Sequence, residues 1–89
     1  MPRVIFTPNL KRHIECPDAE VAGDTVRQAL DAVFAEHPQL RGYIVDEHNR
    51  LRRHMAVFVN GRPLKDRDQL SDAVELAGEI FVMQALSGG

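Results

Sequence analysis

The residues that most clearly suggest a chemical role are the last three, Ser87, Gly88 and Gly89. Glycine has no Cβ, so a Gly-Gly end can lie extended in a channel too narrow for side chains. Two such glycines arise by chance with a probability of roughly 0.5%, given a glycine usage of about 7% per position. The reactive group would be the α-carboxylate of Gly89, which is a poor electrophile. A nucleotide-using partner would have to activate it, for example as a mixed anhydride with AMP, before a sulfur or nitrogen nucleophile captured the acyl group.

No other set of residues predicts a reaction centre. The histidines form no i, i+4 pair and have no cysteine partner, so a zinc site has no support; they are His13, His37, His48 and His54. No Ser-His-Asp or Cys-His arrangement can be argued from such dispersed residues. We therefore expect no catalytic residue, no metal and no bound cofactor.

Two further features have competing interpretations. A lone cysteine, Cys16, could relay sulfur, but a cysteine in an apolar alternation is more often a small core residue, and packing is favoured. The basic run from Arg50 to His54 contains three arginines. A solvated loop is favoured for it over a contact with an acidic partner.

Composition limits the class of protein. With 89 residues, 44% of them apolar and 27% charged, the chain should form one small globular domain. A formal net charge of −2 gives no general attraction to nucleic acid. A single cysteine, with no secretory segment and no apolar run long enough to span a membrane, predicts a cytoplasmic protein without a membrane partner.

The first half of the chain predicts two strands and a helix. Arg3 to Thr7 is β-prone, with Val4 and Phe6 on one face, and Leu10 to Cys16 is interpreted as a second strand returning as a hairpin. Asp24 is the expected N-cap of an amphipathic helix that Pro38 ends at His37. Its apolar residues fall at i, i+3, i+4, i+7 and i+8: Val26, Ala29, Leu30, Val33 and Phe34.

The second half predicts further strands. Met55 to Val59 is a clear strand ended by the turn dipeptide Asn60-Gly61, and Ile80 to Gln84 forms the last strand. Leu70 to Leu76 contains an apolar pattern compatible with one helical turn. The stretch from Leu40 to His54 stays unassigned.

One main helix packed on one mixed sheet of four to five strands is an α+β roll. We expect the helix to be buried against strand residues of one parity: Val4, Phe6, Val57, Val59, Ile80 and Val82. The opposite parity leaves Phe58, Phe81 and Met83 facing away from the helix beside the tail. An exposed apolar patch of this kind predicts a partner-docking surface.

With this order and tail, the sequence resembles the ubiquitin-like β-grasp sulfur carriers of the MoaD/ThiS family across nearly its whole length. The stretch from Leu40 to His54 is similar to the longer members, including the carrier used in cysteine biosynthesis. The most specific matches are Gly88-Gly89, the segment 57–61, Gly78-Glu79-Ile80 and Asp24-Thr25-Val26.

The resemblance implies a β-grasp domain over residues 1–86 and a flexible diglycine tail over 87–89. A ThiF/MoeB-like enzyme would use ATP to adenylate Gly89. A sulfur donor would then convert Gly89 to a thiocarboxylate that serves a downstream acceptor synthase. The segment entering the partner's active site would be Leu86, Ser87, Gly88 and Gly89.

Two alternatives stay open beside the sulfur carrier. A protein modifier would join the same activated glycine to a lysine amine, and a non-carrier β-grasp binding module would use only the sheet face. Many family members carry prolines and Val-Ala before the diglycine, whereas this chain has Gln84-Ala85-Leu86-Ser87. The acceptor pathway is therefore left open.

Overall fold

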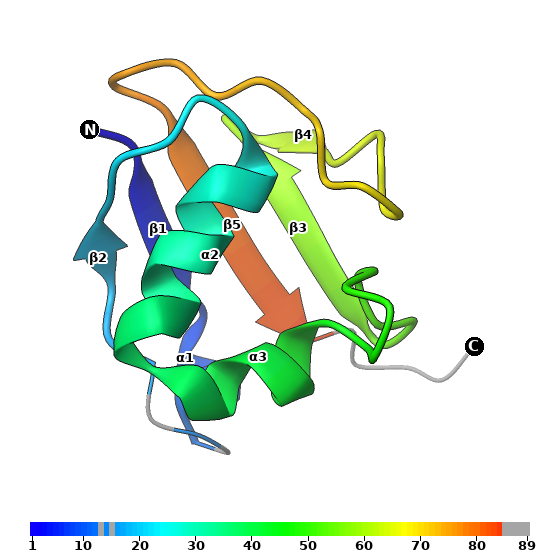
Figure 1. The fold of residues 1–89 in the computed structure, drawn as a ribbon. Helices are drawn as coiled ribbons and strands as arrows, with labels where there is room; N and C mark the ends of the chain where they lie inside the picture. The colour runs from blue at the N-terminus through cyan, green and yellow to red at the C-terminus, as the bar shows by residue number, and fades with distance from the viewer. Residues whose placement is uncertain (13, 15, 85–89) are drawn as a thin grey trace.

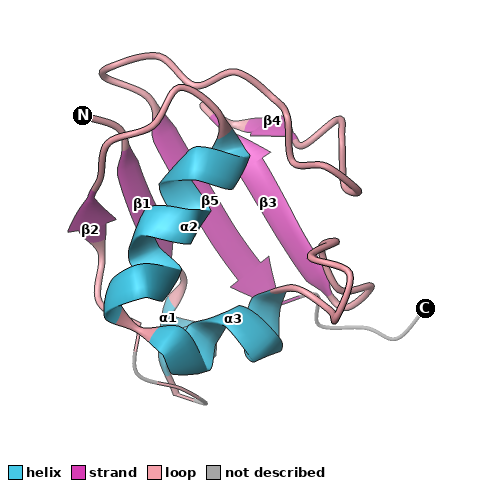
Figure 2. Ribbon diagram, viewed as in Figure 1, coloured by secondary structure: helices cyan, strands magenta, loops and turns pink. Residues whose placement is uncertain are grey.

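The computed structural model describes residues 1–12, 14 and 16–84, in which a sheet of five strands is packed on one main helix (Figures 1 and 2). The elements in chain order are β1 (Arg3–Phe6), α1 (Pro8–Lys11), β2 (Ala19–Glu20), α2 (Val26–Glu36), α3 (Pro38–Ile44), β3 (Met55–Val59), β4 (Arg62–Pro63) and β5 (Glu79–Gln84). The strand order is β2-β1-β5-β3-β4, with β1 parallel to β5 and the other neighbours antiparallel. The predicted α+β roll with a mixed sheet is confirmed.

The predicted strand from Leu10 to Cys16 is wrong. Pro8 begins the short helix α1 instead, where its fixed φ suits the first helical position, and the Leu10 side chain is buried in the core. The partner of β1 is β2, whose Ala19 pairs with Val4. Asp18, the residue before β2, also contacts β1: its Oδ1 accepts a hydrogen bond from the backbone N–H of Phe6 at 3.1 Å.

Helix α2 begins one residue later than predicted. Its N-cap is Thr25, not Asp24: the Thr25 Oγ1 accepts from the Gln28 N–H at 3.2 Å. Gln28 in turn accepts the Asp24 N–H with its Oε1 at 2.7 Å, so two amide groups at the helix entry are satisfied. The helix ends before Pro38 as predicted, and α3 starts at that proline.

The predicted helix face lies in the core, where all five residues expected on that face of α2 are buried. Most of the predicted strand residues join them: Val4, Phe6, Val57, Ile80 and Val82. Val59 differs, since it is only half-buried at the margin of the core. Helix α3 covers one end of the sheet with Leu40 and Ile44, residues that periodicity had left unassigned.

The connection after β3 is a tight turn in which Asn60 and Gly61 have φ of 50° and 82°. Two successive positive φ values match a type I′ hairpin turn, which explains the Asn-Gly dipeptide. The helical turn predicted between Leu70 and Leu76 is wrong. Leu70 instead has a φ of 56° and its side chain is fully buried. Most of the residues that follow it up to Ala77 are exposed, so the segment is an irregular connection that inserts Leu70 and Val74 into the core.

Candidate functional site

The predicted reactive segment lies beyond the last strand. Gly89 and the tail residues Leu86, Ser87 and Gly88 fall outside the described residues, so the structure fixes only where this segment begins. The described part of the chain ends two residues before Leu86, at Gln84 in β5, which lies between β1 and β3 in the sheet. The tail is thus attached to the central strand of the sheet, which is paired along both edges.

The sheet register brings the predicted docking residues together. Phe58 lies directly opposite Phe81 across the β3–β5 pair, and Met83 lies opposite Ala56 in the neighbouring row. The alternating residues Val57, Ile80 and Val82 are buried beneath α2, so the two phenylalanines and Met83 face the other side of the sheet. All three side chains are half-buried. We call Phe58, Phe81 and Met83 the sheet-face patch.

Two further apolar residues extend the row that crosses the sheet at Phe81. Ile5 is the β1 partner of Phe81, and Pro63 is the β4 partner of Phe58. Sequence alternation had placed Ile5 on the outward face of its strand, but only the strand order puts β1 beside β5. At the β1 end of this face, Arg3 and Glu79 form an exposed ion pair at 3.8 Å. An apolar centre with a charged margin is the usual composition of a protein interface.

The end of β5 is held from α3 and β3. The Tyr43 hydroxyl donates a hydrogen bond to Oε1 of Gln84 at 3.1 Å, and Gln84 pairs with the buried Met55. The Tyr43 ring packs edge-on against His54, with centroids 6.3 Å apart and planes at 84°. These contacts fix the position from which the tail leaves the domain. No sequence pattern linked Tyr43 to the tail.

Cys16 lies in the core, as the packing interpretation predicted. Its Sγ donates to the carbonyl oxygen of Ile14 at 3.2 Å. Burial raises the pKa of the Cys16 thiol, so the thiolate needed for sulfur transfer is disfavoured. Within residues 1–12, 14 and 16–84, no group of three or more His, Cys, Asp or Glu side chains could hold a metal ion.

Two acidic residues in the loops accept hydrogen bonds from backbone N–H groups and so hold the loop backbone in place. Asp66 accepts hydrogen bonds from the N–H groups of Gln69 and Asp68, at 2.9 and 3.2 Å, and from the Ser71 hydroxyl. The hydrogen bond from Gln69, followed by that from Ser71, lowers the pKa of the Asp66 carboxyl. Asp46 acts similarly, because the N–H groups of Arg50 and His48 lower its pKa. Neither carboxylate is prepared for general acid catalysis, which requires a raised pKa.

None of the helices in the described part of the chain combines the length and the apolar character needed to cross a membrane. No protein-family model matches the sequence, and no curated protein matches it. Solved structures do. A chain of the BexX/CysO complex from Amycolatopsis orientalis aligns over 100% of both chains with a TM-score of 0.82 and 24% identity.

The chain has the ubiquitin-like β-grasp fold. CysO of Mycobacterium tuberculosis shares this β-grasp fold at 17% identity and a TM-score of 0.80, covering 97% of this chain and 100% of its own. Small archaeal modifier protein 1 of Haloferax volcanii is 26% identical with a TM-score of 0.75, covering 99% and 98%. The resemblance predicted from the sequence is therefore confirmed at the level of the fold. These neighbours agree with the predicted class of ubiquitin-like carriers and modifiers.

Proposed function

We propose that this β-grasp protein is a sulfur carrier whose Gly89 is adenylated by a ThiF/MoeB-like enzyme and converted to a thiocarboxylate. The observation that carries the proposal is the position of Gly88-Gly89, four and five residues beyond the end of a strand that is paired along both edges and has apolar residues on its outer face. The whole-length similarity to CysO supports it. The protein would be a cosubstrate that binds no cofactor itself.

The chemistry needs only the α-carboxylate of this chain. A carboxylate oxygen of Gly89 attacks the α-phosphorus of ATP in the partner enzyme, and pyrophosphate leaves. A sulfur nucleophile from the donor then attacks the acyl carbon and AMP leaves, which gives the thiocarboxylate. The thiocarboxylate passes its sulfur to an acceptor synthase in cofactor, cysteine or other metabolite biosynthesis. Because ATP is consumed, the cytoplasm is the compartment we assign.

The domain's role is to deliver the tail. In the proposal, the sheet-face patch docks on the activating enzyme, while residues 86–89 extend into its active site. Five residues beyond Gln84 span about 17 Å at about 3.3 to 3.6 Å each. This length lets the folded domain remain on the enzyme surface while Gly89 reaches the nucleotide. The absence of side chains at positions 88 and 89 lets the channel close around the backbone.

The second candidate is a protein modifier, which the similarity to small archaeal modifier protein 1 favours. A lysine amine would attack the same acyl adenylate in place of sulfur, so both functions share the first step. A third candidate, a binding module that uses only the sheet face, would not need Gly89.

One experiment separates the three. The protein is incubated with the ThiF/MoeB-like enzyme of the same organism, MgATP and sodium sulfide, and intact mass is measured. We expect a gain that equals the exchange of one oxygen for sulfur, located on the C-terminal peptide. A lysine-linked adduct would move the assignment to modifier. If the mass stays unchanged while that enzyme charges another carrier, sulfur carriage is wrong for this chain.

A further inference from the structure

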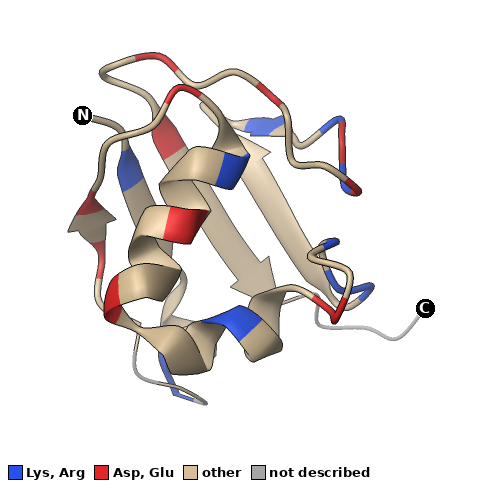
Figure 3. Cartoon of the chain, viewed as in Figure 1, with Lys and Arg blue, Asp and Glu red and all other residues tan. Residues whose placement is uncertain are grey.

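Positive charge is concentrated beside the end of β5, on a surface that the proposed function does not use. An open hollow there is lined by four arginines and a histidine, which we call the arginine rim: Arg50, Arg52, Arg53, His54 and Arg67. Two aspartates, Asp46 and Asp68, also line it, so the arginines leave a formal excess of two positive charges. The chain as a whole has a net charge of −2. Figure 3 shows a group of basic positions in the loop before β3, with acidic positions beside it, and further basic positions on β1, α2, α3 and β4.

Tertiary contacts bring together the two loops that form the rim, one before β3 and one after β4. Arg27 of α2 joins them: its Nη2 donates to the Asn49 carbonyl oxygen at 2.6 Å, and its Nε donates to the Gln69 carbonyl oxygen at 3.1 Å. The Leu51 N–H also donates to the Arg67 carbonyl oxygen at 2.9 Å. Arg67 is thereby brought beside the basic run at 50–54.

Neutral groups hold two of the four rim arginines. The Arg52 Nε donates to the Gly42 carbonyl oxygen at 2.8 Å, and the Arg67 Nη2 donates to the carbonyl oxygens of Arg52 and Met55, both at 2.9 Å. A carbonyl oxygen orients a guanidinium without neutralising it. These side chains therefore keep their charge for a partner and lose less conformational entropy when they bind it.

The other two rim arginines are both exposed. Arg50 lies 3.5 Å from the Asp46 carboxylate, which already accepts two backbone N–H groups. Arg53 is exposed and has no carboxylate partner among the residues the structure describes. Its position therefore allows a change of charge that leaves the described contacts of the domain intact.

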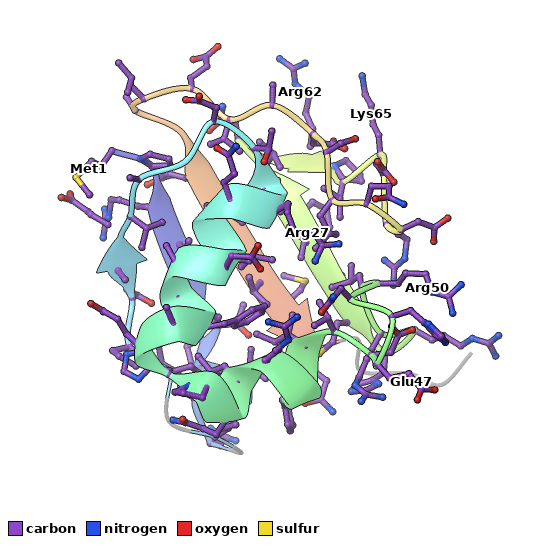
Figure 4. All side chains as sticks on the ribbon, in the orientation of Figure 1. Met1, Arg27, Glu47, Arg50, Arg62 and Lys65 are labelled. Atoms are coloured by element: carbon purple, nitrogen blue, oxygen red, sulfur yellow. The ribbon has the colours of Figure 1, made fainter. Side chains whose placement is uncertain are left out.

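The rim borders the start of the tail. Arg53 and His54 immediately precede Met55, the residue that pairs with Gln84. Figure 4 shows Arg50 at this end of the sheet, whereas Arg62 and Lys65 project from the opposite end. A partner that receives the tail must therefore pass close to the rim.

We propose that the arginine rim binds an acidic protein surface at the entrance of the active site that receives the tail. This inference rests on the proposed carrier function. Charge complementarity steers two proteins before they touch, over a range of about 8 to 10 Å at ordinary ionic strength. Guanidinium groups also fit carboxylates in a two-pronged geometry. The rim thus orients the domain so that the tail points into the active site.

An acidic protein surface is favoured over nucleic acid. The hollow carries a formal excess of two positive charges in a chain of net charge −2, so the rest of the chain is net negative and gives a phosphate backbone no general attraction. Among the residues that the structure describes, the aromatic ring packed against the rim is that of Tyr43, which contacts His54, is half-buried and donates a hydrogen bond to Gln84. A half-buried ring presents less surface than an exposed one for a base to stack on.

The test uses Arg53→Glu, with Arg62→Glu as the matched control of equal charge change at the opposite end of the sheet. Adenylation by the ThiF/MoeB-like enzyme of the same organism is followed as ATP–pyrophosphate exchange at 50 and 300 mM NaCl. We expect Arg53→Glu to raise KM about tenfold at the lower salt, with kcat unchanged and the difference reduced at the higher salt. Arg62→Glu should stay within about twofold of the parent. Equal KM values for the two variants would overturn the proposal.

A second measurement tests acidic-partner binding by the rim even if no adenylation occurs. Absence of adenylation would refute the carrier function and would not bear on binding by the rim. The ¹⁵N-labelled protein is titrated with a hexaglutamate peptide and, separately, with a single-stranded RNA hexamer. Peptide-induced shifts of the amides of residues 50–54 and 67, lost in Arg53→Glu, support the proposal. Unchanged rim amides overturn it, as does tighter binding of the RNA at the same residues.

Discussion

The hydroxyl of Tyr43 in α3 donates a hydrogen bond to the side-chain carbonyl of Gln84, the last described residue of β5, over a distance of 3.1 Å. Helix α3 therefore contacts the strand end from which the tail departs. The same strand end is paired with Met55, so it is held from two sides. The position of Gln84, after which the undescribed residues follow, is thus set in part by a residue far from it in sequence.

Tyr43→Phe should loosen this strand end without disturbing the core. The ring and its contact with His54 remain, whereas one partly buried hydrogen bond is lost, at a cost of about 0.5 to 1.5 kcal/mol in the free energy of unfolding. Hydrogen exchange at the Gln84 amide should accelerate. A double-mutant cycle with Gln84→Ala measures the coupling, and fully additive effects would show that the bond is not formed in solution.

Leu30→Ala should destabilise the fold by about 2 to 5 kcal/mol, since it opens a cavity between α2 and the sheet. Leu30 is fully buried. Asp31→Ala on the exposed side of the same helix is the control and should change stability by no more than about 0.5 kcal/mol. Urea unfolding of both variants measures the difference. A Leu30→Ala protein as stable as the control would contradict the assigned core.

Phe81→Asp should weaken docking more than folding. Phe81 is half-buried opposite Phe58, and cross-strand pairs of this kind contribute about 0.2 to 1 kcal/mol to sheet stability. Val82→Ala is the contrasting variant, because Val82 is fully buried on the other face and should affect stability but not binding. Calorimetric titration with the activating enzyme and urea unfolding separate the two effects. If Phe81→Asp simply unfolds the protein, Phe81 belongs to the core and the sheet-face patch is wrong.

Gly88→Ala should slow adenylation while leaving the free energy of unfolding unchanged. In the proposed complex, the channel of the activating enzyme fits closely around backbone without side chains, and a Cβ at position 88 would have to fit into it. Removal of Gly89 should abolish the formation of acyl adenylate. ATP–pyrophosphate exchange and urea unfolding are measured on both variants and the parent. Full activity of the Gly88→Ala protein would mean that the channel tolerates side chains.

Asp66→Asn should lower stability at neutral pH and lose its effect in acid. The pKa of Asp66 is lowered in the folded state by hydrogen bonds from Gln69 and Ser71, so the charged form stabilises the fold. This contribution is complete above the unfolded-state pKa of about 4 and disappears as pH falls through the lower folded-state value. Urea unfolding at pH 7 and at successive values below pH 4 should show the two proteins converging. A difference that persists in acid would assign the effect to geometry rather than charge.

The sequence by itself determined the elements whose signal is local. Strand β3 and its Asn60-Gly61 turn, strand β5 and helix α2 follow from periodicity and turn chemistry within a few residues of each other. The same alternation places Phe58 and Phe81 on the face of the sheet that points away from α2. The diglycine at 88–89 needs no structure to be noticed, because its chemistry lies in the absence of side chains.

Tertiary structure decided the remainder, since burial between distant segments outweighs local preference. Leu10 and Leu70 enter the core from a short helix and an irregular connection, neither of which has a periodic pattern long enough to predict it. The pairing of β1 with β2 depends on strand order, which alternation cannot encode. Arg67 joins the arginine rim, and Tyr43 reaches Gln84, only because the fold closes loops of 12 to 41 residues between the bonded groups. Contacts of that range are set by the packing of the whole core rather than by neighbouring residues.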